Sequence, residues 1–229
     1  MNIFASAFHA PPAEWTRFFI ALTGIFLFIG TAEFVRKNRG WPAEINRKIV
    51  HILTGVLILF TPWMFTSSAP LLWMAFIFIV FDLYGVLTGK LRGMHDSGRI
   101  SYGTVFYPLT FFILTAFCWP GYQSVLIVSM LILAFADAAA ALTGNLVSAP
   151  CTYTAGPDKK SLQGSAAMFL TTFLIVTIAL PPLSKLDSFS VTAGEAVWYG
   201  ILTALFATTL EAVSVKGSDN LSAPLGSAV

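Results

Sequence analysis

Charged residues are scarce in this chain. Only 10% of its 229 residues are Asp, Glu, Lys or Arg, whereas about a quarter of an ordinary soluble domain is charged. So few charges cannot cover a globular surface with solvated groups, which excludes a soluble single domain. Cysteine is scarce as well, and the distant residues Cys118 and Cys151 provide neither a disulfide framework nor the spacing of a zinc site. The net charge of +2 is too small to indicate a nucleic-acid partner.

Apolar residues are abundant instead. They make up 56% of the chain, and its 21 Phe and 6 Trp exclude a disordered, solvated coil. A helix needs about 20 mostly apolar residues to span a bilayer. Because the apolar runs are continuous rather than alternating, a β-barrel is disfavoured. We expect an all-α integral membrane protein, a single-domain bundle over residues 1–229 of about seven transmembrane helices at 15–34, 49–65, 71–87, 104–119, 125–146, 162–180 and 196–213.

The positive charges lie in alternate connections between these segments. Eleven of the 13 basic residues fall on one side: Arg36, Lys37, Arg39, Arg47, Lys48, Lys90, Arg92, Arg99, Lys159, Lys160 and Lys216. Only Arg17 and Lys185 lie on the other side. Because cytoplasmic loops carry the excess of Lys and Arg, we expect a multi-pass protein with its N-terminus outside and its C-terminus and active face in the cytoplasm.

Four acidic residues fall within the predicted spans: Glu33, Asp82, Asp137 and Glu211. Ionisable groups at membrane depth are costly and usually functional, and all four lie in the cytoplasmic halves of their helices. This convergence predicts a site for metal and phosphate, since Mg²⁺ commonly bridges carboxylates to substrate phosphates. For Glu33 an equally good interpretation is a carboxylate that reaches the interface or pairs with a loop arginine. Asp137 shares a helix face with the small residue Gly144, where helices or a ligand can approach closely.

The segment before the sixth predicted span is basic. Lys159 and Lys160 precede Ser161, which can start a helix whose free amides would bind phosphate. Gly164 would let a phosphate approach the backbone. The alternative is that the two lysines only mark the cytoplasmic side.

A histidine lies near the start of the second predicted span. Arg47 and His51 are four residues apart and therefore share one face of a helix. A lone histidine at this depth would mean little, but beside an arginine and level with the acids His51 is a candidate for phosphate contact.

Five short motifs occur in the order typical of one enzyme family. They are Arg47-Lys48-x-x-His51, Gly103-x-x-x-Tyr107-Pro108-Leu109, Asp137-x-x-Ala140-x-x-x-Gly144, Lys160-Ser161-x-x-Gly164-Ser165-x-Ala167-x-Phe169, and Glu211 followed by Asp219-Asn220-Leu221-x-x-Pro224-Leu225. In these motifs the chain resembles the CTP-dependent polyprenol kinase family, which includes dolichol, phytol and farnesol kinases and the yeast-type diacylglycerol kinase. The resemblance implies transfer of the γ-phosphate of CTP to a lipid alcohol, with Mg²⁺ or another divalent cation as cofactor.

Phosphoryl transfer depends on positioning and charge neutralisation, and from this requirement we expect roles for residues of these motifs and for the adjacent Lys159. Those expected to be catalytic are Asp137, Lys160 and His51. Those expected to bind the nucleotide are Arg47, Lys48, Lys159, Ser161, Gly164 and Asn220. Those expected to hold the metal are Asp137, Glu211 and Asp219, and Asp137 is also the candidate acceptor of the alcohol proton.

Several alternatives remain open at the level of sequence. The alcohol could be phytol, geranylgeraniol, a polyprenol or dolichol, and a CTP-dependent diacylglycerol kinase would use the same motifs. A CDP-diacylglycerol synthase-like cytidylyltransferase would also use CTP and Mg²⁺, although its acidic C-terminal signature is missing. A small membrane transporter would tolerate buried acids but would need a water path to both faces. The chain could also form a homo-oligomer.

Overall fold

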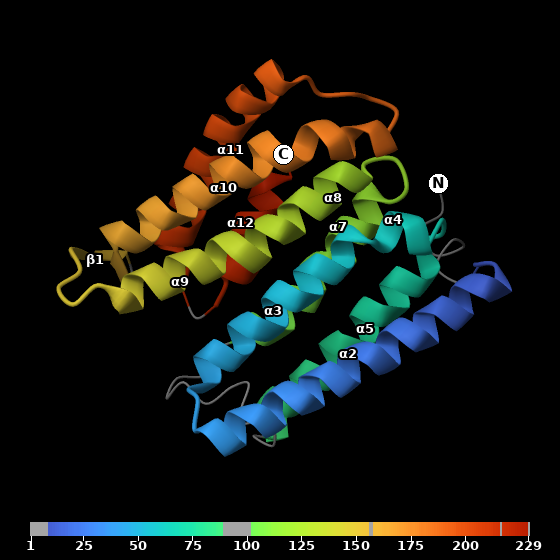
Figure 1. Ribbon diagram of the computed structural model, residues 1–229, viewed down its shortest axis with the longest axis horizontal. Helices are drawn as coiled ribbons and strands as arrows, with labels where there is room; N and C mark the ends of the chain where they lie inside the picture. Colours follow the sequence, from blue (N-terminus) through green and yellow to red (C-terminus); the bar gives the residue numbers. More distant parts are fainter. Residues whose placement is uncertain (1–8, 89–101, 156–157, 216, 229) are drawn as a thin grey trace.

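The apolar runs form long helices that pass up and down along one axis (Figure 1). The computed structural model describes residues 9–88, 102–155, 158–215 and 217–228. The long helices are α2 (Pro12–Arg39), α3 (Ala43–Leu59), α5 (Ala69–Thr88), α7 (Gly103–Cys118), a continuous helix made of α8 (Gln123–Leu131), η1 (Ile132–Ala136) and α9 (Asp137–Leu146), α10 (Leu162–Leu183), and α11 (Ala193–Val213). The shorter elements are α4 (Thr61–Met64), β1 (Thr152–Ala155), β2 (Asp158–Ser161), η2 (Ser184–Leu186) and α12 (Asp219–Ser227).

Five of the described helices are long and apolar enough to cross a membrane: Pro12–Arg39, Ala69–Thr88, Gln123–Leu146, Leu162–Leu186 and Ala193–Val213. Helices α3 and α7, with 17 and 16 residues, are shorter than the roughly 20 residues that a straight span requires. The chain is therefore a predominantly helical membrane protein with five candidate spans, and the count of seven remains a prediction.

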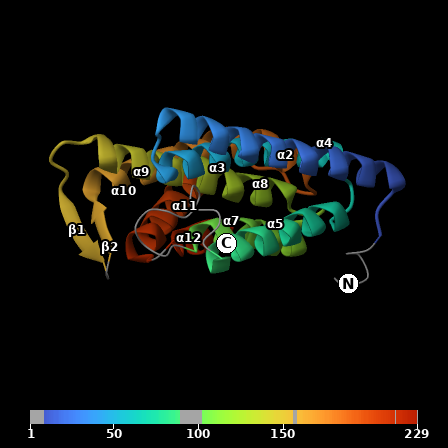
Figure 2. The same ribbon diagram turned by 90° about the horizontal axis from the view of Figure 1, so that it is seen from below.

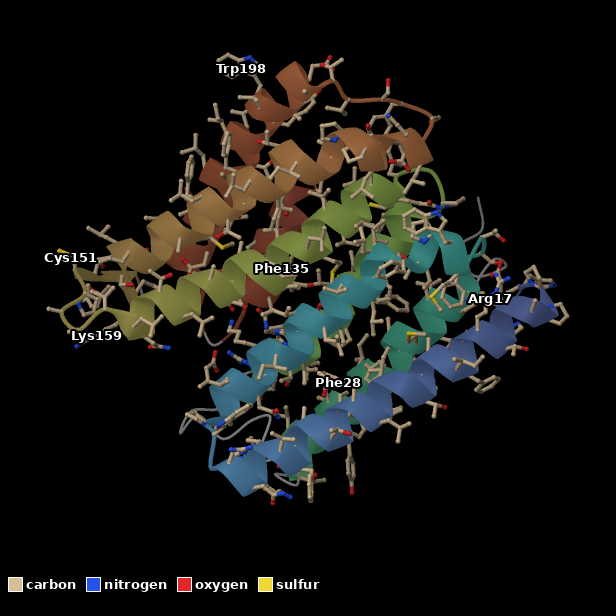
Figure 3. All side chains as sticks on the ribbon, in the orientation of Figure 1. Arg17, Phe28, Phe135, Cys151, Lys159 and Trp198 are labelled. Atoms are coloured by element: carbon tan, nitrogen blue, oxygen red, sulfur yellow. The ribbon has the colours of Figure 1, made fainter. Side chains whose placement is uncertain are left out.

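Large apolar side chains point outward from the bundle. In the apolar 18-residue stretch of α2, only 11% of the residues are buried. Trp198 on α11 projects from the outer edge with 70% of its surface exposed (Figure 3). This distribution is the reverse of a soluble protein's, whose exposed apolar patches are small. It is the distribution expected where the outer surface contacts lipid.

The continuous helix 123–146 forms the centre of the bundle. In its apolar 18-residue stretch, 67% of the residues are buried. The fully enclosed side chains include Leu126, Ile127, Met130 and Ile132. Helix α3 crosses it closely, because a Cβ on Gly55 would lie 2.4 Å from the Cβ of Ala134. The contact lies within η1, a π-helical turn, which is a local irregularity found frequently at functional sites.

Among the described residues, β1 and β2 are the only strands, and they form an antiparallel hairpin in an otherwise helical chain. Figure 2 shows this hairpin beyond one end of the bundle, where α9 ends and α10 begins. We call this the hairpin end. The last described segment also differs from a simple tail, since α12 folds back and packs against α11, α7, α8 and η1. Of the predicted cytoplasmic basic residues, Lys90, Arg92, Arg99 and Lys216 lie outside the described residues.

At the opposite end of the bundle, two other carboxylates accept hydrogen bonds from backbone amides. Glu14 is only 3% exposed and accepts hydrogen bonds from the backbone amides and hydroxyls of Thr66 and Ser67. Asp187 accepts hydrogen bonds from the first amides of α8, those of Gln123 and Ser124. Both acids satisfy backbone groups that helix ends and turns leave free, so each of them has a structural role.

Candidate active site at the hairpin end

Helix α3 directs a lysine into the interior. Lys48 is only 6% exposed, and its Nζ donates a hydrogen bond to Oδ2 of Asp137, forming a buried ion pair. Glu44, in the first turn of α3, accepts a hydrogen bond of 2.8 Å from Arg47 and lies 3.9 Å from the Lys48 ammonium. The Arg-Lys motif is therefore held by carboxylates on both sides.

The π-helical turn immediately precedes Asp137. Asp137 is 7% exposed and begins α9 directly after η1. Such a turn changes the rotational register of the helix, and here Asp137 meets α3 while the small residues that follow face α10. A Cβ on Gly144 would lie 3.0 Å from Oγ of Ser161. The small-residue face predicted from the sequence is thus a packing face, and the acid lies beside it.

Strand β2 separates the two adjacent lysines. Successive side chains of a strand point to opposite sides, so Lys160 turns toward α11 and α12 while Lys159 is exposed at the molecular edge (Figure 3). The Lys160 Nζ lies 2.5 Å from Oε1 of Glu211 and 3.7 Å from Oδ2 of Asp219. Only Lys160 of this pair therefore belongs to the interior site.

These ion pairs form one electrostatic unit. Although burial opposes its charge, the carboxylates of Asp219 and Glu211 raise the pKa of Lys160. Burial and the nearby Asp137 carboxylate raise the pKa of Asp219, against the attraction of Lys160 and Lys48. The charges of Asp137 and Asp219 also act on Arg47. We call the six residues the charge cluster: Arg47, Lys48, Asp137, Lys160, Glu211 and Asp219.

The carboxylates expected to share a metal ion are instead paired with lysines. Among the described residues, no three His, Cys, Asp or Glu side chains lie close enough together to hold a metal ion. One oxygen is nevertheless available, because Oε2 of Glu211 is buried and has no hydrogen-bond partner in the described part of the chain. Mg²⁺ that arrives with substrate phosphates needs only one or two carboxylates, so this donor set fits a metal brought by a nucleotide better than a preformed metal centre.

Three residues expected to bind the nucleotide are engaged in packing or capping. Ser161 is the N-cap of α10, as the sequence predicted, and its hydroxyl accepts a hydrogen bond of 3.1 Å from the Gly164 amide. A Cβ on Gly164 would lie 3.0 Å from the carbonyl oxygen of Ala140, so close helix packing accounts for this glycine. Asn220 is 2% exposed, and its Nδ2 donates to the Gly103 carbonyl at 2.7 Å, which ties α12 to α7.

The four acids in the predicted spans do not converge on one point. Glu33 pairs with Arg36 at 2.7 Å and with Lys37 at 3.7 Å, so the interpretation as a locally paired carboxylate is the correct one for it. Asp137 and Glu211 belong to the charge cluster. Asp82 lies apart from the cluster, in the wall of a cavity.

This cavity has a volume of about 380 Å³ and is lined by α2, α3, α4, α5 and α7. Its walls are almost entirely apolar, with side chains such as Ile25, Phe28 and Met74. Besides Thr54 and Thr61, the polar residues of the lining are His51, Asp82, Thr104 and Tyr107. Asp82 lies near the end of α5, and Thr104 and Tyr107 lie near the start of α7, so we call this part the polar end of the cavity.

His51 connects the cavity with the charge cluster. It lines the cavity, and it follows Lys48 by one helical turn on α3. Tyr107 stacks on its ring with centroids 4.2 Å apart and donates a hydrogen bond of 3.0 Å to the His51 carbonyl. Tyr107 belongs to one of the five sequence motifs, but the motif alone indicates no role for it, because its partner His51 is 56 residues away in the chain.

Comparison with known proteins identifies relatives over almost the whole chain. No protein-family model matches it, and no solved structure does. A phytol kinase from Synechocystis sp. is 32% identical over 220 residues, which cover 94% of this chain and 90% of the relative. Probable chloroplastic phytol kinases from Triticum aestivum and Glycine max are 25% and 27% identical, covering 90% and 96% of this chain and 72% and 77% of the relatives. The chain belongs to the phytol kinase family.

Proposed function

We propose that this protein is an isoprenoid-alcohol kinase, which transfers the γ-phosphate of a nucleoside triphosphate to the hydroxyl of a long-chain alcohol of the phytol type. One observation carries the proposal beyond the similarity to phytol kinases: an apolar cavity and a buried charge cluster meet at His51. A lipid alcohol has the matching form, an apolar tail ending in one polar group.

The cavity suits the tail of the alcohol. Its volume of about 380 Å³ lies in the range of small-molecule sites, which are mostly apolar with a few placed polar groups. An alkyl or prenyl chain would gain about 25 cal/mol for each Å² of apolar surface removed from water. The hydroxyl would then lie at the polar end, beside His51.

The charge cluster suits the triphosphate. Arg47, Lys48 and Lys160 would exchange their carboxylate partners for phosphate oxygens, and Lys159 at the molecular edge would contribute to the approach of the nucleotide. We propose CTP as the donor, on the resemblance to the CTP-dependent kinases. When bound, Mg²⁺ supplies neutralisation of the phosphate charge, and the residues that would hold it are Glu211, through its free oxygen, with Asp219 and Asp137.

The chemistry follows from these positions. The alcohol oxygen attacks the γ-phosphorus, and the bond from that phosphorus to the β–γ bridging oxygen breaks, releasing the nucleoside diphosphate. Asp137 accepts the alcohol proton, while Lys160 and His51 contact the transferring phosphoryl group. Catalysis of this kind rests mainly on positioning and on charge neutralisation, which a buried cluster provides more effectively than a solvated one.

The proposed orientation places the hairpin end in the cytoplasm. The described basic residues at the ends of α2, α3 and β2 lie at that end of the bundle (Figure 1), and the cytoplasmic side is where basic residues accumulate. The nucleotide would then enter the charge cluster from the aqueous phase, and the alcohol would enter the cavity from the bilayer.

Purified protein in lipid nanodiscs tests the proposal. Phytol, geranylgeraniol, dolichol and diacylglycerol are each supplied with CTP, ATP, GTP or UTP labelled at the γ-phosphate, and labelled lipid is counted. We expect labelled isoprenoid phosphate with CTP, and its loss in Asp137→Asn but not in the matched acid-to-amide variant Glu33→Gln. Release of pyrophosphate would indicate a cytidylyltransferase, labelling of diacylglycerol alone a diacylglycerol kinase, and absence of any product would favour a transporter.

A further inference from the structure

Asp82 is a buried carboxyl group with an unsatisfied oxygen. Asp82 is only 6% exposed, and its Oδ1 has no hydrogen-bond partner among the described residues. Glu33, Asp137 and Glu211 differ in that each is paired with a basic residue. Burying a polar atom without a partner costs stability, and an ionisable group kept at membrane depth without structural use indicates a functional role.

The place of Asp82 in the fold suggests its ligand. It lines the apolar cavity and lies six residues before the end of α5, which corresponds to about 9 Å from the hairpin end along the helix axis. His51, in the middle of α3, and Thr104, in the first turn of α7, line the same cavity. Nδ1 of His51 is likewise buried without a hydrogen-bond partner in the described part of the chain. Two of the residues that line the cavity therefore each carry a buried polar atom without a hydrogen-bond partner in the described part of the chain.

We infer that Asp82 binds the hydroxyl of the lipid alcohol and holds it at the boundary between the cavity and the charge cluster. A hydroxyl has one proton to donate and can also accept a hydrogen bond, so before the nucleotide binds it can satisfy the free oxygen of Asp82. A hydrocarbon of the same shape would fill the cavity but leave that oxygen unpaired. The inference rests on the proposed function for the identity of the alcohol.

This arrangement makes Asp82 a determinant of specificity. A site built to hydrogen-bond a substrate hydroxyl rejects an analogue without it, because the buried polar group of the protein is then left without a partner. A carboxylate-bearing lipid would be disfavoured too, since it would place a second acidic group against Asp82. The selected class is a long apolar chain with one terminal hydroxyl.

Equilibrium binding in the absence of nucleotide tests the inference. The probes are tritiated phytol and, as a competitor, phytane, the saturated hydrocarbon with the same branched skeleton. Wild-type protein should prefer the alcohol by about tenfold or more, the factor that corresponds to one net hydrogen bond. In Asp82→Leu, which keeps the branched shape at Cγ but removes both oxygens, this preference should disappear through loss of phytol affinity. Asp82→Asn, which keeps an acceptor oxygen, should retain most of it.

A matched variant in the apolar wall separates hydrogen bonding from shape. Phe78 lines the same cavity on the same helix, and Phe78→Leu should weaken phytol and phytane alike. Equal affinity of wild-type protein for the two ligands would overturn the inference without any variant, and so would an undiminished preference in Asp82→Leu. Wild-type protein that prefers phytol but transfers no phosphate from any nucleotide would contradict the proposed kinase activity and still support Asp82 as a hydroxyl site.

Discussion

Lys48 and Asp137 form a buried ion pair between residues 89 positions apart in the chain. The pair joins α3 to the start of α9 at the π-helical turn, and on α3 Lys48 lies three residues before His51, which lines the apolar cavity. Removing one member of a buried pair leaves an uncompensated charge, which costs about 3–5 kcal/mol. The same two residues therefore affect both folding and the proposed chemistry, and the two effects can be separated.

The first prediction uses this pair. Lys48→Met should lower the thermal midpoint of the purified protein markedly, because it leaves the Asp137 carboxylate buried without its partner. The double variant Lys48→Met/Asp137→Asn should recover most of that stability, since no buried charge remains unpaired. Kinase activity should be lower than that of the wild-type protein in both variants, on the order of 100-fold or more, because a proton acceptor or charge-stabilising group is lost. Activity that returned together with stability would show that the pair is only structural.

The second prediction concerns the two lysines of β2. Lys160→Ala should raise the KM for CTP about tenfold or more and leave the KM for the alcohol nearly unchanged, because its ammonium lies within the charge cluster. Lys159→Ala is the matched control, and its exposed side chain predicts a change of less than about threefold. Lys160→Arg should recover only part of the loss, since a planar guanidinium replaces a compact ammonium poorly. Equal effects at positions 159 and 160 would contradict the division that the strand imposes.

The third prediction concerns Gly164, which the sequence placed at a phosphate. The structure places the carbonyl oxygen of Ala140 within 3.0 Å of any added Cβ, so Gly164→Val should separate α10 from α9. Overpacking of this kind costs typically 1–3 kcal/mol, and the thermal midpoint should fall. The matched control is Gly30→Ala on α2, where nothing lies within 4 Å of the added Cβ, and the midpoint should be unchanged or higher. A stable Gly164→Val protein with a raised KM for CTP would restore the phosphate interpretation.

The fourth prediction tests orientation with a native reporter. Cys151 is exposed at the hairpin end (Figure 3), so a membrane-impermeant maleimide should label it only from the cytoplasmic side. In a Cys118→Ala/Cys151→Ser background, Ser190→Cys, exposed in the connection at the opposite end, should be labelled only from outside. Labelling of both positions from one side would exclude the N-outside arrangement.

Much of the architecture could be predicted from the sequence, because its cause is local. Long apolar runs favour membrane helices wherever they occur, and each predicted span corresponds to a helix or helix pair in the described chain. The N-cap at Ser161 was also predictable, since a cap depends on residues within one turn. For Glu33, the neighbouring Arg36 and Lys37 already offered the pairing that the structure shows.

What only the tertiary structure decided are the contacts between distant segments. From the sequence we expected the four acids to converge, because they lie at a similar depth in the membrane. Depth does not determine which face of its helix a residue occupies. Asp82 therefore lies in the cavity wall, while Asp137 pairs with Lys48. Lys159 and Lys160 cannot be distinguished from the sequence alone. They lie in strand β2, and because successive side chains of a strand point to opposite sides, only Lys160 faces the interior. The cavity itself has no sequence signature, because it arises from side chains on five helices whose packing is set by contacts far apart in the chain.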